Sequence, residues 1–98
     1  MCMLDEIRAK REKIYAIAGR HKAEKLWVFG SCARKEETPE SDVDFLVKFA
    51  PKTTVFDFVR LQSSIANVLK RNVDIVDFDA LSYERLFADE VRKDMVAV

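Results

Sequence analysis

The sequence predicts an α/β (α+β) fold, in which helices flank a small mixed sheet of about three strands. Three short apolar segments, at residues 25–29, 41–47 and 72–77, have the length and patterning of strands. Around them, apolar residues recur at helical spacing. Ninety-eight residues can bury one modest core, so we expect a single domain over residues 1–98.

Two helices have clear signals. An apolar stripe over residues 4–18 predicts a first helix that ends near Gly19. Thr54, followed three residues later by Asp57, predicts a capping box and a helix that runs to about Lys70.

The other expected helices are shorter or lie near the C-terminus. Residues 32–35 could begin a short helix after a Gly-Ser turn. Ser82 is expected to cap a last helix, with Leu81 and Leu86 as its hydrophobic staple. The apolar tail over residues 95–98 is expected to pack on the core or on a neighbouring chain. The oligomeric state therefore stays open, and both a homo-oligomer and a hetero-oligomer are compatible with the sequence.

The composition excludes several classes of protein. Apolar residues make up 49% and charged residues 35%, which is typical of a globular domain and not of a disordered chain. No apolar run could cross a membrane, and the N-terminus lacks the core of a signal peptide, so we expect a cytoplasmic protein with no membrane partner. The formal net charge is zero, which does not favour a nucleic-acid partner. The basic run between Arg8 and Lys25 is better explained as a solvated helix face.

Asp42 and Asp44 are the first candidates for chemistry. Because side chains alternate along a strand, both carboxylates should point to one face, ~6–7 Å apart, and the apolar residues 43, 45 and 47 should point to the core. Asp74 stands in the next predicted strand, which could lie beside the first. Three convergent carboxylates can hold two Mg²⁺ ions, which activate an attacking oxygen and stabilise leaving pyrophosphate. Asp74 would then act as, or orient, the general base.

A Gly-Ser turn precedes these acids. Gly30 and Ser31 could hold the β- and γ-phosphates of a nucleotide, because glycine lets the backbone approach closely. Arg34 or Lys35 could add positive charge.

Ordinary structural roles would also explain each candidate residue. Asp-x-Asp is common on exposed strand faces, and Asp74 could instead pair with Lys70 or Arg71. Asp77 and Asp79 fall where the third strand ends and are expected in a loop. His21 is expected to be a solvated surface residue.

Taken together, these motifs resemble the nucleotidyltransferase superfamily that includes DNA polymerase beta, and most closely its minimal nucleotidyltransferase (MNT) family. The resemblance covers nearly the whole chain and rests on two segments, FGSCARKEETPESDVDFLV and VFDFVRLQSSIANVLKRNVDIVDFDAL. It implies that Asp42, Asp44 and Asp74 are the metal-binding acids of catalysis. By the same resemblance, the nucleotide-binding residues are Gly30, Ser31 and Arg34.

Two positions depart from the family pattern. Lys35 stands where glycine is usual, and Cys32 where an aromatic residue is common. Neither is expected to touch the acids, but the lysine could alter the turn or the nucleotide preference.

The resemblance also implies a partner. Such proteins are typically antitoxins that transfer AMP from ATP to a tyrosine hydroxyl of a HEPN-domain toxin, a reaction called AMPylation. A chain with the catalytic half and no second lobe fits an acceptor delivered by a partner protein. Two alternatives stay open: an antitoxin that neutralises by binding alone, and a nucleotidyltransferase whose acceptor is an RNA or a small molecule. The base preference and the number of transfers are not marked by any motif.

Overall fold

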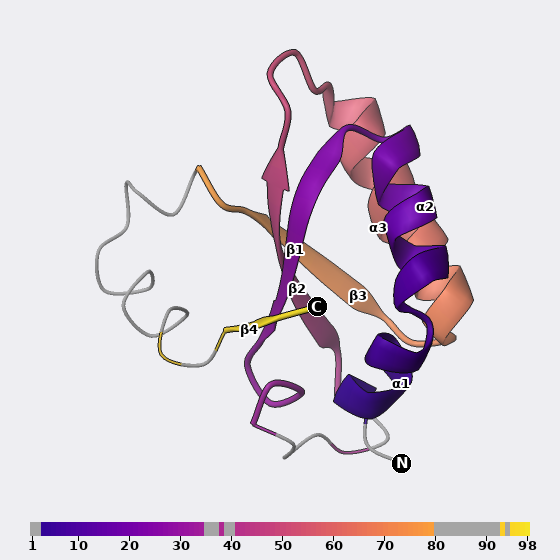
Figure 1. The fold of residues 1–98 in the computed structure, drawn as a ribbon, viewed down its shortest axis with the longest axis vertical. Helices are drawn as coiled ribbons and strands as arrows, with labels where there is room; N and C mark the ends of the chain where they lie inside the picture. The colour runs from indigo at the N-terminus through magenta and orange to yellow at the C-terminus, as the bar shows by residue number, and fades with distance from the viewer. Residues whose placement is uncertain (1–2, 35–37, 39–40, 80–92, 94) are drawn as a thin grey trace.

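The computed structural model describes residues 3–34, 38, 41–79, 93 and 95–98. Three helices and four strands are present in this part of the chain (Figure 1). In chain order they are α1 (Met3–Ala9), α2 (Arg11–Arg20), β1 (Ala23–Phe29), β2 (Val43–Phe49), α3 (Val55–Leu69), β3 (Val73–Asp77) and β4 (Val96–Ala97). No helix in these ranges is long and apolar enough to span a membrane.

The sheet is mixed, as predicted, with the strand order β3-β2-β1-β4. β1 and β2 are antiparallel, β2 and β3 are parallel, and α3 makes the connection between the parallel pair. β4 was not predicted and adds a fourth strand antiparallel to β1. The tail is fixed there because the Tyr15 hydroxyl donates to the Val98 carbonyl, 2.6 Å away, and the Val98 side chain is buried.

The helices gather on one side of the sheet and bury its inner face (Figure 1). Val43, Phe45 and Val47 of β2 are fully buried in this core, as the alternation predicted. Alternate strand residues therefore point to the other face, which carries a smaller cluster around Phe29 and Leu46. That outer face is also the one to which Asp44 and Asp74 belong.

The first predicted helix is two helices. The break falls at Lys10, whose φ of −101° and ψ of 15° leave the helical range. Its ammonium group bonds the Glu6 carboxylate at 3.1 Å and the Val68 carbonyl of α3 at 3.4 Å. This contact comes from residues far apart in the sequence, and the apolar spacing alone could not reveal it.

The capping box of α3 is confirmed. The Thr54 hydroxyl accepts the Asp57 N–H at 3.3 Å, and the Asp57 carboxylate accepts the Thr54 N–H at 3.2 Å. The helix ends at Leu69, and the next residue, Lys70, adopts a left-handed conformation with φ 55°. A left-handed residue at this position is a common way to stop a helix.

Other boundaries differ from the predictions. β2 begins at Val43 and not at residue 41, so Asp42 lies just before the strand. Residues 31–34 form turns and no helix. The helix expected after Ser82, with Leu81 and Leu86, lies outside the described residues.

Candidate active site

Asp44 stands at the centre of the candidate site. It is paired with Phe29 of β1 on one side and with Asp74 of β3 on the other. Paired residues of neighbouring strands lie about 5 Å apart and point to the same face. The parallel pairing of β2 and β3 therefore brings the two predicted carboxylates to adjacent positions.

Gly30 is in close contact with Asp44. Its φ is +73°, and a Cβ atom at this position would lie 2.8 Å from Oδ2 of Asp44. Only glycine avoids both the strained backbone and this overlap. The sequence predicted that this glycine admits a phosphate, and the structure adds that the Asp44 carboxylate already lies against it.

Asp42 is exposed at the end of the loop that leads into β2. Together with Asp74 it lines a hollow of ≈330 Å³ between the C-terminal half of α3 and β3. On the other side it lines a second hollow, of ≈650 Å³, whose rim carries Lys70 and Arg71. Asp42 and Asp74 thus face common open space.

The three acids interact electrostatically. Burial raises the pKa of the Asp44 carboxyl, and the charges of Asp74 and then Asp42 raise it further. Even so, no three acid, histidine or cysteine side chains in the described part of the chain converge into a complete metal cage. The acids are therefore near enough to repel one another, yet their side chains do not point at one common centre.

Arg71 is a residue whose place in the site the sequence did not predict. One of its terminal nitrogens donates to the carbonyls of Thr38, at 2.8 Å, and Ser41, at 2.5 Å. The Val43 N–H donates to the Asn72 carbonyl at 2.9 Å. These bonds tie the segment before Asp42 to the start of β3. The sequence indicates Arg71 only as a partner of Asp74. Its carbonyl partners, Ser41 and Thr38, lie 30 and 33 residues away along the chain, so no local pattern connects them with it.

The remaining candidates of the nucleotide-binding turn lie beside Gly30. Ser31 is half-buried, and Arg34 is exposed one turn further on. The Arg34 N–H donates to the Gly30 carbonyl at 3.2 Å, which closes a single turn. Lys35 lies outside the described residues. The expectation that Cys32 does not touch the acids was wrong, because its buried thiol lies 3.9 Å from the Asp42 carbonyl oxygen.

Three other side chains are at the far end of the sheet from this site. Asp79 lies in the turn after β3, as predicted, and its carboxylate forms an ion pair with Lys48 at 2.5 Å. The prediction that Asp77 lies in a loop was wrong, because the parallel pairing of β3 with β2 extends to this residue. His21 is half-buried, with Nδ1 3.9 Å from the Asp57 carboxylate. The prediction that His21 is a solvated surface residue was wrong, because Asp57 of the α3 capping box lies beside its ring.

Comparisons with known proteins agree with this geometry. Residues 12–97 match the family model of the polymerase beta nucleotidyltransferase domain. A "putative protein adenylyltransferase" of Methanocaldococcus jannaschii is 32% identical over 88 residues, which cover 90% of this chain and 92% of that protein. A second protein of that description and organism is 33% identical over 73 residues, covering 74% of this chain and 72% of the relative.

Solved structures share the fold. One described as a "putative minimal nucleotidyltransferase" superimposes with a TM-score of 0.83 at 36% identity, covering 100% of this chain and 97% of that one. A chain from the complex of a tri-AMPylated Shewanella oneidensis HEPN toxin with its MNT antitoxin has a TM-score of 0.65 at 21% identity, covering 92% of this chain and 69% of that one. At that identity the second likeness shows the fold alone. Because the family model matches most of the chain, the resemblance drawn from the sequence is confirmed: the protein belongs to the polymerase beta nucleotidyltransferase family, as a minimal nucleotidyltransferase.

Proposed function

We propose that the protein is a Mg²⁺-dependent adenylyltransferase that transfers AMP from ATP to a tyrosine hydroxyl of a HEPN-domain toxin and so acts as its antitoxin. The observation that carries the proposal is the in-register pairing of Asp44 with Asp74, which brings two carboxylates together beside the turn at Gly30. The raised pKa of Asp44, caused by burial and by the charges of Asp74 and Asp42, agrees with this arrangement. AMP as the transferred group is supported by the protein-adenylyltransferase names of the relatives. A HEPN partner is supported by the AMPylated toxin in the Shewanella oneidensis complex.

The donor set fits Mg²⁺. Carboxylate oxygens are the ligands that this ion prefers. Burial raises the pKa of Asp44 most, and a divalent cation would relieve the repulsion from Asp74 and Asp42 that raises it further. We assign Asp42, Asp44 and Asp74 as the residues that hold two such ions. Bound there, the ions would supply positive charge to the reacting α-phosphate and the leaving pyrophosphate. Asp42 is exposed, so a rotation of its side chain toward Asp44 would complete the set of ligands.

In the proposed reaction, the acceptor hydroxyl oxygen bonds to the α-phosphorus of ATP. The bond from that phosphorus to the oxygen bridging the β-phosphate breaks, and pyrophosphate leaves with the electron pair. Asp74 accepts the hydroxyl proton or orients the group that accepts it. The backbone and hydroxyl of Gly30 and Ser31 bind the β- and γ-phosphates, and Arg34 adds charge.

A transfer assay tests the proposal. The protein is mixed with Mg²⁺, its HEPN-domain partner and ATP labelled at the α-phosphate. The Asp42→Asn/Asp44→Asn variant should fold and bind the partner but transfer no label. The matched control, Asp5→Asn/Glu12→Gln, makes the same charge change on the helices and should retain transfer.

Each other outcome points to a different function. Label transferred by the Asp42→Asn/Asp44→Asn variant would refute the metal-site assignment. Neutralisation of the toxin by that variant, without any label, would favour an antitoxin that acts by binding alone. Label in RNA or in a small molecule, and none in protein, would favour the other acceptor classes.

A further inference from the structure

The helix α3 carries apolar residues on two sides. The inward side contributes Leu61 and Ile65, which are fully buried in the core. The outward side leaves Val55, Phe56 and Val59 exposed at 77%, 74% and 54%. Contiguous exposed apolar side chains of this kind mark interaction surfaces.

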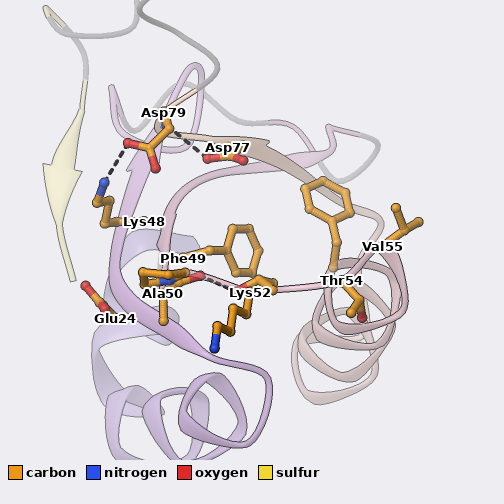
Figure 2. A pocket seen from close by; sticks show the side chains of 12 residues that line it. Glu24, Lys48, Phe49, Ala50, Lys52, Thr54, Val55, Asp77 and Asp79 are labelled. Atoms are coloured by element: carbon orange, nitrogen blue, oxygen red, sulfur yellow. Dashed lines mark hydrogen bonds and ion pairs between the residues drawn. The ribbon is translucent and has the colours of Figure 1, made fainter.

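A pocket of ≈590 Å³ opens beside this outward side (Figure 2). Phe49 and Phe58, whose ring centroids are 5.7 Å apart, line it together with Val55 and the turn at Lys52. Figure 2 shows Val55 and Thr54 on the helix side, with the ion pair between Lys48 and Asp79 away from them. The pocket offers a bulky apolar side chain an aromatic floor next to the exposed stripe.

The exposed charges on α3 and on the turn before it are positive next to the stripe, whereas the acids that line the pocket, Glu24, Asp77 and Asp79, lie away from Val55 (Figure 2). Lys52 and Arg60 are both exposed, and neither forms an ion pair with a described residue. The nearby acid, Asp57, is engaged by the Thr54 cap and lies 3.5 Å from the Lys22 ammonium. The surface around Val55, Phe56 and Val59 therefore complements an apolar group flanked by carboxylates.

This surface is remote from the candidate active site along the sheet. Asp44 is near the start of β2 and Phe49 is at its end, a separation of roughly 17 Å at strand spacing. A ligand that reaches the acids and also covers the stripe must be a macromolecule. A stripe of three apolar side chains with two cations suits protein better than RNA, which needs more clustered positive charge. A symmetric pair of this chain would bring Lys52 and Arg60 of both copies together, which is unfavourable.

We propose that the outward side of α3 (Val55, Phe56, Val59), with the adjoining pocket, docks the protein acceptor of the transfer reaction through an apolar side chain flanked by acidic residues. The proposal rests on the proposed function for the identity of that acceptor, a HEPN-domain protein. Docking here would hold the acceptor while its hydroxyl reaches the acids at the other end of the sheet.

Binding of the HEPN-domain partner to purified variants tests the proposal. Phe56→Ser/Val59→Ser should weaken the Kd by about 10-fold or more, since exposed apolar anchors dominate such interfaces. The control Phe56→Leu/Val59→Ile keeps the stripe apolar and should bind within about threefold of the original protein. Lys52→Glu/Arg60→Glu should also weaken binding, most strongly at low salt. Thermal melting verifies that each variant is folded.

The outcomes separate this proposal from the proposed function. Asp42→Asn/Asp44→Asn should bind normally and transfer nothing, so loss of transfer with intact binding concerns catalysis alone. If no AMP is transferred but binding depends on Phe56, the docking surface stands and the proposed function fails. Undiminished binding by folded Phe56→Ser/Val59→Ser overturns the docking surface. So does self-association through the stripe, or failure of the original protein to bind the HEPN protein.

Discussion

Gly30→Ala is the substitution for which the structure makes the sharpest prediction. A non-glycine residue at a φ of +73° costs about 1–2 kcal/mol. The new Cβ would also lie 2.8 Å from Oδ2 of Asp44, so that carboxylate must retreat by about half an ångström to reach ordinary contact. We expect the melting temperature to fall by roughly 5–15 °C in a domain of this size. We also expect Mg²⁺-dependent transfer to fall by about 100-fold, because a small misplacement of a catalytic group is costly.

Gly19→Ala is the matched control. A Cβ at Gly19 meets nothing within 4 Å, and the residue lies in the last turns of α2. The same substitution should therefore raise the stability, by about 0.5–1 kcal/mol, through higher helix propensity. Activity should not change.

Gly30→Asn separates the two causes at Gly30. Asparagine tolerates the left-handed conformation better than alanine, but it still places a Cβ against Asp44. Its melting temperature should recover in part, while its transfer rate stays low. Thermal melts and single-turnover transfer of labelled AMP measure both quantities. A Gly30→Ala protein with the original melting temperature and rate would refute the close contact between Gly30 and Asp44 as the reason for glycine.

Three further predictions concern the acids, the loop and the cap. The raised pKa of Asp44 means that the folded chain binds this proton more tightly than the unfolded chain does, so metal-free protein should lose stability as the pH rises through that pKa. In thermal melts across the pH range, Asp44→Asn should not show this loss of stability, and Mg²⁺ should not stabilise it. A pH profile of stability that the substitution leaves unchanged would contradict the raised pKa of Asp44. Arg71→Met removes the bonds that hold the segment before Asp42, so a magnesium titration of activity should shift to higher concentration, and an unshifted titration would show that Arg71 does not position the site. Thr54→Ala removes the hydroxyl that caps Asp57 and should cost about 1 kcal/mol in a denaturant melt; a cost near zero would mean that the capping box does not stabilise α3.

Features encoded by local pattern were predicted well. The alternation around Asp44 predicted which side chains enter the core, and the structure buries Val43, Phe45 and Val47 accordingly. The capping box at Thr54 was equally readable, because it needs only two residues three positions apart.

Features that depend on distant contacts were missed or misplaced. β4 is two residues long, too short for a periodic signal, and it forms because the tail pairs with Trp27 and Val28. The break at Lys10 depends in part on a carbonyl of α3. β2 begins at Val43, two residues later than predicted, because its pairing with the neighbouring strands starts there, and Asp42 therefore lies in the preceding loop.

The candidate site divides in the same way. The sequence by itself determined the identity and order of Gly30, Asp42, Asp44 and Asp74, and with them the family, because spacing along the chain carries that information. Only the tertiary structure decided that Asp44 is paired with Asp74 in register and lies against Gly30. It also decided that the second apolar side of α3 stays exposed. The physical reason is that strand registers and close contacts join residues that are far apart in the sequence. Which of these contacts form depends on how the whole core packs, and no local sequence pattern records that.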